Sequence, residues 1–123
     1  MLWLAVALGG SLGAMARYAC YLLWGSQLKG FPMTTFVINV IGSLLIGVAY
    51  VLVVQAAMLS GIWRQFFIVG FLGSFTTFST FSLETLRLLE QGHLFFALSY
   101  LVASLIFGLL AAYLGVTITE RML

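Results

Sequence analysis

Residues 73–82 read GSFTTFSTFS and lie in the middle of a 123-residue chain that is 63% hydrophobic. Six of these ten side chains carry a hydroxyl group, three are phenylalanines spaced three residues apart, and none is aliphatic. A few Ser and Thr residues in a membrane helix can bond to the carbonyl group four residues earlier. Six such residues within positions 74–82 exceed what helix packing needs, so the run predicts a polar site inside a membrane domain.

The composition around this run is that of an integral membrane protein. Only 7% of the residues are charged, against about 25% in soluble domains. The five bases are scattered singly, which argues against a nucleic-acid surface. We expect no enzyme activity, since no embedded Ser or Cys has a plausible base nearby. The single Cys20 is expected to be a packing residue.

The spacing of charged residues predicts four membrane helices. A helix needs about 20 residues to cross a hydrocarbon core of about 30 Å. Residues 30–63 and 91–119 contain no charged side chain, and each run must hold one span. We therefore expect one all-α transmembrane domain over residues 1–123. Its helices are expected at about residues 2–24, 32–57, 62–89 and 94–118, with short connections at about 25–31, 58–61 and 90–93.

The loops carry little information about orientation. With four spans, Arg64 and Arg121 share one side of the membrane, while Lys29 and Arg87 share the other. The positive-inside rule depends on a Lys/Arg imbalance between short loops, and here two bases face two. Either an unseen determinant or Arg17 fixes one orientation, or the chain inserts both ways and pairs with its inverted copy as an antiparallel, dual-topology homodimer.

Several polar side chains are expected at membrane depth. Arg17 either snorkels to the interface or forms a fixed positive charge in a vestibule that attracts anions. Asn39 shares a helix face with Thr35, and its amide could either join helices or donate hydrogen bonds to an anion. In the fourth helix, Tyr100 and Ser104 are candidates for lining a pathway.

The third helix is expected to be broken near its middle. Gly70 and Gly73 precede the hydroxyl run, and glycines followed by Ser or Thr are places where a membrane helix can open if the freed backbone lines a cavity. The opened carbonyl groups could coordinate a hard cation such as Na+. Amide protons, hydroxyl protons and the positive ring edges of Phe78 and Phe81 suit an anion. The absence of an arginine ring favours a small anion.

Three motifs identify the chain as a member of the Fluc (CrcB) family of fluoride channels. Residues 9–14, GGSLGA, followed by Arg17, resemble the family's G-G-x-x-G-A-x-x-R first helix. Thr35, Asn39, Gly42 and Ser43 match the spacing of its second helix. Residues 70–84, GFLGSFTTFSTFSLE, resemble its signature G-F-x-G-x-x-T-T-F-S-T-F-S-x-E. The resemblance covers essentially the whole chain.

This resemblance implies a passive, fluoride-selective channel that releases fluoride from the cytoplasm across the bacterial inner (plasma) membrane. It implies an antiparallel dual-topology homodimer with two pores and a structural Na+ at its centre, held by the backbone carbonyl groups of Gly73 and Thr76. It also assigns roles to ten side chains: pore phenylalanines Phe78 and Phe81, pore amide Asn39, polar track Ser79 and Thr80, vestibule Arg17, lining residues Thr35, Tyr100 and Ser104, and the acid Glu84 beyond the track. Gly108 stands where some members carry a hydroxyl.

Two other functions would also suit a small four-helix membrane protein. Small multidrug resistance transporters are also four-helix dual-topology dimers, but their proton-coupled export needs a carboxylate in the first helix, where this chain has only Arg17. A non-transporting accessory subunit would use the hydroxyl run only to join helices. Transport assays separate both from a channel.

Overall fold

Every regular element in the part of the chain that the structure describes is helical, as the sequence predicts. The computed structural model describes residues 1–27 and 29–123, and Leu28 of the first expected connection lies outside them. The elements are α1 (Leu2–Trp24), α2 (Met33–Ala49), η1 (Tyr50–Gln55), α3 (Gly61–Arg64), η2 (Gln65–Leu72), α4 (Gly73–Phe75), α5 (Phe78–Glu90) and α6 (Leu94–Met122), where η marks π-helix.

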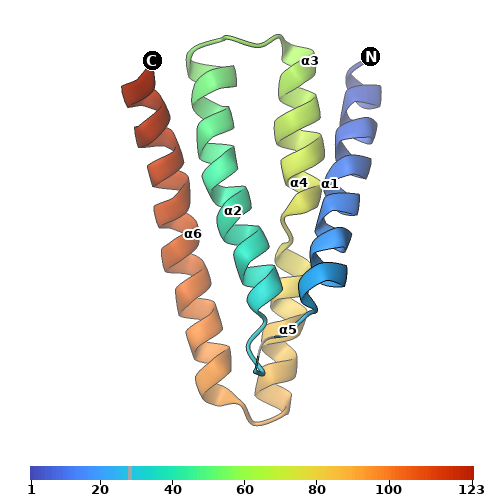
Figure 1. Cartoon of the computed structure of the whole chain (residues 1–123), viewed down its shortest axis with the longest axis vertical. Helices are drawn as coiled ribbons and strands as arrows, with labels where there is room; N and C mark the ends of the chain where they lie inside the picture. Colours follow the sequence, from blue (N-terminus) through green and yellow to red (C-terminus); the bar gives the residue numbers. More distant parts are fainter. Residues whose placement is uncertain (28) are drawn as a thin grey trace.

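These elements join into four helices that are long and apolar enough to cross a membrane: Leu2–Trp24, Met33–Gln55, Gly61–Glu90 and Leu94–Met122. The described part of the chain is thus all-helical with four candidate membrane spans, and both termini lie at the same end (Figure 1). The last helix runs past the expected end at residue 118 to Met122. It continues because the residues after 118 include no Gly or Pro that would stop a helix.

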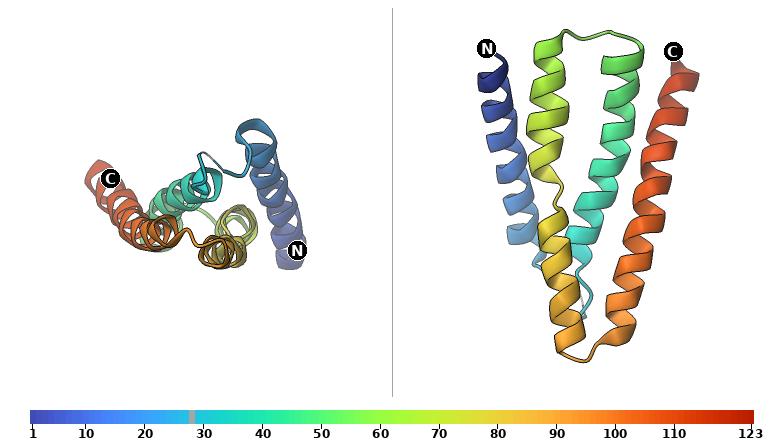
Figure 2. Two further views of the ribbon diagram at one scale, coloured as in Figure 1. Left: turned by 90° about the horizontal axis from the view of Figure 1, so that it is seen from below. Right: turned by 180° about the vertical axis from the view of Figure 1, so that it is seen from behind.

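The four spans are arranged as two close pairs, in which α1 packs mainly on η2, and α2 mainly on α6. Glycines allow the backbones to approach closely. A Cβ atom added to Gly9 would overlap the carbonyl oxygen of Phe66, and one added to Gly115 would overlap that of Leu44. The pairs spread apart toward the end that holds the termini, where residues 56–60 connect them (Figures 1 and 2).

At the opposite end the helices converge on an aromatic core. Leu88, Ala97 and Tyr100 are almost fully buried there. Phe31 meets the Tyr100 ring edge to face, with centroids 5.4 Å apart, and Phe81 does the same at 4.9 Å. Such edge-to-face contacts add to the free energy gained by burying the rings. This core fixes the positions of α2, α5 and α6 around the polar residues described below.

The hydroxyl-rich run is divided between two helices. Helix α4 ends at Phe75, and α5 begins at Phe78. The two residues between them have extended backbones, with φ −79° and ψ 157° at Thr76 and φ −150° and ψ 121° at Thr77. Figure 1 shows this extended stretch as a thin ribbon between α4 and α5. Thr77 then caps α5, because its hydroxyl accepts the Thr80 N–H at 3.2 Å.

The packing of α6 on α2 makes a testable prediction. We expect Gly115→Ala to destabilise the protein by about 1–3 kcal/mol, because the new methyl group must displace the backbone of α2. Gly108→Ala is the matched control on the same helix, since its Cβ would meet the Ser43 hydroxyl at an ordinary contact distance of 3.7 Å. Thermal unfolding in detergent measures both variants, and equal melting temperatures would refute the close α2–α6 contact.

Candidate functional site

The centre of the candidate site is a pairing between the Asn39 side chain and the peptide group of Thr77. The Asn39 Nδ2 donates to the Thr77 carbonyl oxygen at 3.0 Å, and the Thr77 N–H donates to Asn39 Oδ1 at 2.9 Å. Gly42 lies one helical turn further along α2, where a Cβ atom would overlap Thr76. The absence of a side chain at Gly42 therefore lets the extended residues come close enough to α2 for the pairing to form.

This pairing changes the hydrogen bonding of the third helix. In a continuous α-helix, the N–H of Thr77 would bond to the carbonyl group of Gly73, and the N–H of Thr80 to that of Thr76. Here the first donor goes to Asn39 Oδ1 and the second to the Thr77 hydroxyl. The carbonyl groups of Gly73 and Thr76, both singled out from the sequence, thereby lose their helical donors.

Arg17 accounts for a third carbonyl group at the interruption. Its Nε donates to the carbonyl oxygen of Ser74 at 3.1 Å, which links α1 to α4. The side chain is half-buried, so at least this nitrogen is directed into the protein rather than toward a membrane surface. The contact places a positive charge one residue away from Gly73.

A polar groove of about 290 Å³ opens beside the extended residues. It is lined by Asn39, Gly42, Ser43, Ile46, Leu72, Gly73, Thr76, Thr77 and Phe78. None of these residues is charged, and the groove offers side-chain amide and hydroxyl groups as well as backbone. An uncharged polar groove between membrane helices can replace part of an ion's hydration shell.

Phe78 lines the groove at the start of α5, and Phe81 lies one helical turn further along the same helix. Their ring centroids are 5.8 Å apart, as expected for residues three apart on a helix. Phe78 is 79% exposed, whereas Phe81 packs edge to face against Tyr100. Phe75, the first member of the phenylalanine series, belongs instead to α4, where it stacks on Phe71. The interruption thus separates it from the other two.

A second cluster of polar groups surrounds Glu84. The Thr35 hydroxyl donates to Oε1 and the Tyr100 hydroxyl to Oε2, both at 2.8 Å. Tyr21 also bonds to the Thr35 hydroxyl, and because the single proton of Thr35 points to Glu84, Tyr21 must be the donor. These four side chains come from α1, α2, α5 and α6. The cluster therefore joins all four membrane spans.

The structure brings some of the predicted site residues to the groove and leaves others apart from it. Thr80 is connected to the residues that line the groove, because its hydroxyl accepts a 3.1 Å hydrogen bond from the Thr77 hydroxyl. Ser79 is exposed. Ser104 has a buried hydroxyl with no hydrogen-bond partner among the described residues. The sequence did not predict Tyr21 as a site residue, and it did not predict that Thr77 would pair with Asn39 and cap α5. The one available signal for Tyr21 was its position four residues after Arg17, on the same face of the first helix.

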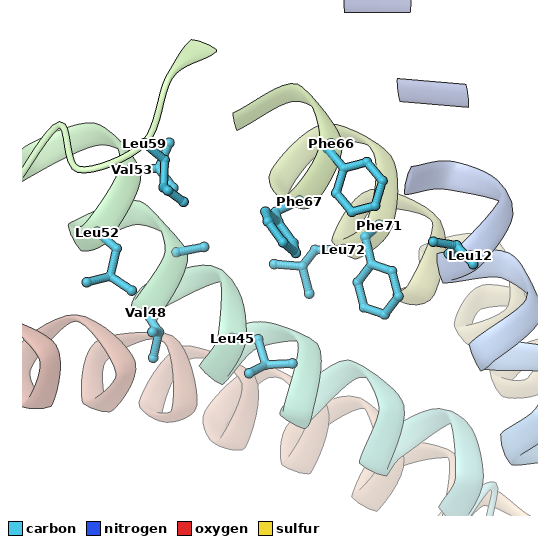
Figure 3. A pocket seen from close by; sticks show the side chains of 11 residues that line it. Leu12, Leu45, Val48, Leu52, Val53, Leu59, Phe66, Phe67, Phe71 and Leu72 are labelled. Carbon is cyan, nitrogen blue, oxygen red and sulfur yellow. The ribbon is translucent and has the colours of Figure 1, made fainter. Parts of the chain in front are cut away.

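Two further features bear on which ions could bind. A larger pocket of about 590 Å³ between α1, α2 and η2 is lined only by apolar side chains, including Leu12, Leu45 and Phe71 (Figure 3), and cannot coordinate an ion. Among residues 1–27 and 29–123, no three His, Cys, Asp or Glu side chains lie together as a metal site.

Comparisons with known proteins match this chain over nearly its whole length. Residues 4–116 match the family model described as CrcB-like protein, camphor resistance (CrcB). A protein of Saccharophagus degradans named fluoride-specific ion channel FluC is 50% identical, over 99% of this chain and 92% of its own. Proteins of the same name are 45% identical in Acidobacterium capsulatum, over 98% of both chains, and 49% identical in Thermus thermophilus, over 92% and 90%.

The Glu84 cluster makes a prediction about stability. We expect Thr35→Val to destabilise the protein by about 1–3 kcal/mol, since it leaves Glu84 Oε1 without a donor and the Tyr21 hydroxyl without its acceptor. Thr85→Val is a matched control, because the Thr85 hydroxyl bonds only to a carbonyl group of its own helix, that of Phe81. If thermal unfolding shows the same stability for both variants, the cluster does not hold the helices together.

Proposed function

The chain belongs to the CrcB family, and we propose that it is a passive, fluoride-selective channel that lets fluoride leave the cytoplasm. The observation that carries the proposal is the groove at Thr76 and Thr77, which places uncharged hydrogen-bond donors at membrane depth. The relatives' names supply the ion, because this chain shares about half of their residues over nearly its full length.

The chemistry of the groove suits a small anion. Asn39 keeps one N–H that its pairing with Thr77 does not use. The exposed edge of Phe78 carries partial positive charge. None of the residues that line the groove is acidic, so the groove itself carries no negative charge that would repel an anion. Replacing the tightly held water of a compact ion requires several such donors at once.

Along the rest of the pathway, we assign residues by their positions on the helices that surround the groove. Thr80 and Ser79 continue the polar track along α5, with Phe81 beside them, and Ser104 adds a hydroxyl from α6. Arg17 supplies a positive charge in a vestibule that raises the local anion concentration. Glu84, with Thr35 and Tyr100, forms the end of the track, where its carboxylate holds the two hydroxyl groups in place.

The working unit is proposed to be an antiparallel, dual-topology homodimer with two pores in the bacterial inner membrane. The balanced loop charges allow insertion in both directions. Phe78 is mostly exposed, and the groove beside it is open, as expected if a second copy completes each pore. The apolar pocket between the two helix pairs offers a partner further apolar surface (Figure 3).

A structural Na+ fits the centre of that dimer. The carbonyl groups of Gly73 and Thr76 are oxygen ligands without helical donors, and hard cations bind such oxygens. Each chain would supply two of them, so an inverted pair would supply four. The Gly73 and Thr76 carbonyl groups would hold the ion, and its charge would balance their dipoles as a structural component of the dimer rather than as a transported species.

Reconstitution into liposomes tests the function. We expect rapid fluoride efflux, negligible chloride efflux and no dependence on a proton gradient, because the donors in the groove replace the fluoride hydration shell without a titratable carrier. An ion-selective electrode measures both anions. Comparable chloride flux would contradict the selective pathway, a proton requirement would favour the small multidrug resistance type of exporter, and no flux of either anion would favour an accessory subunit.

The ring edges have their own test. We expect Phe78→Ile and Phe81→Ile each to slow fluoride efflux by at least about tenfold, since an aliphatic side chain of similar bulk lacks the positive ring edge. Phe75→Ile is a matched control, because Phe75 stacks on Phe71 on the other side of the interruption. Size-exclusion chromatography checks that assembly is unchanged. Normal efflux in both variants would refute the role of the rings.

A further inference from the structure

We propose that Asn39 and the Thr77 hydroxyl are positioning residues for the cation site, because they keep the carbonyl groups of Gly73 and Thr76 free to bind the ion. The inference rests on the proposed function, which includes a Na+ at these carbonyl groups. It explains why the two carbonyl groups are free: the Asn39 and Thr77 side chains accept the two backbone N–H groups that would otherwise bond to them. It also gives Asn39 a role separate from contact with the anion.

The first diversion depends on the acceptor atom of Asn39. Its Oδ1 takes the Thr77 N–H at 2.9 Å, the donor that a continuous helix would offer to Gly73. Without this acceptor, the Thr77 N–H would be left unpaired inside the membrane, which is unfavourable. The nearest remedy is for the helix to close and for this N–H to pair with Gly73. The Gly73 carbonyl group would then be less available to a cation.

The second diversion depends on the Thr77 side chain. Its hydroxyl oxygen accepts the Thr80 N–H at 3.2 Å, the donor that a continuous helix would offer to Thr76. The same hydroxyl donates its proton to the Thr80 hydroxyl at 3.1 Å, which orients its lone pairs toward the N–H. Removing it would free the Thr80 N–H to bond to Thr76 and extend α5 backwards.

Substitutions at Asn39 distinguish the role of its acceptor oxygen from that of its donor nitrogen. Asn39→Asp keeps an oxygen that accepts the Thr77 N–H but loses the N–H that the anion pathway uses. Asn39→Ala loses both. If Asn39 only lines the pathway, both variants impair fluoride flux and neither changes cation binding. If it positions the site, only Asn39→Ala weakens cation binding, and the aspartate rescues it.

The experiment is a NaCl titration of purified protein in detergent, followed by calorimetry, with choline chloride as the control salt. We expect Asn39→Ala and Thr77→Val each to weaken Na+ binding by at least about tenfold, the effect of losing one favourable hydrogen-bond arrangement. Asn39→Asp and the control Thr85→Val should bind within about threefold of the parent, because both keep the diverted donors. Amide hydrogen exchange at Thr77 and Thr80 reports whether the helix has closed.

The possible outcomes separate the inference from the proposed function. Parent-like Na+ binding in both Asn39→Ala and Thr77→Val overturns the inference and leaves the channel and its cation intact. A parent protein that gives no Na+ signal overturns the cation site and the inference together, while the liposome assay still decides whether fluoride passes. If Asn39→Ala does not fold, Thr77→Val still removes the second diversion, and parent-like Na+ binding in that variant overturns the inference.

Discussion

The pairing of the Asn39 amide with the Thr77 peptide group is the interaction on which the middle of the molecule depends. Inside a membrane, each backbone N–H and carbonyl group needs a partner within the protein. Asn39 satisfies both groups of Thr77 from a neighbouring helix, so the third helix can open without leaving them unpaired. The Thr77 side chain then restarts the helix by capping α5. One side-chain amide thus permits an irregular backbone at a depth where such a backbone is otherwise too costly.

The groove and the Glu84 cluster are parts of one continuous arrangement. From the groove, the ring of Phe78 lies 5.8 Å from that of Phe81, which in turn packs 4.9 Å from the ring of Tyr100. The Tyr100 hydroxyl reaches Glu84 at 2.8 Å. Ring edges and hydroxyl groups therefore run along α5 from its first residue to its middle. The aromatic core at this end keeps α5 and α6 in register and holds the row in place.

The sequence alone predicts the four spans, because charge-free runs longer than a bilayer crossing leave little freedom for anything else. It also predicts that something unusual happens at residues 73–82, since hydroxyl groups there exceed what packing requires. It could not predict which donors are diverted. That depends on Gly42 allowing Thr76 to approach α2, a contact between residues 34 positions apart, and hydropathy patterns contain no such information. The hydrogen bond between Tyr21 and Thr35 could not be predicted from the sequence for the same reason, since it forms only where α1 and α2 meet.

The pairing of Asn39 with Thr77 can be measured in the membrane because Asn39 is the only asparagine in the chain. Solid-state NMR on protein in lipid bilayers, labelled with 13C at the asparagine Cγ and with 15N at threonine, measures the dipolar coupling between the Asn39 Cγ and the Thr77 amide nitrogen without ambiguity on the asparagine side. We expect strong dephasing, from a separation of about 4 Å set by an N–H···O=C hydrogen bond. The absence of dephasing would mean that the amide is turned away from the backbone, and the explanation of the opened helix would be wrong.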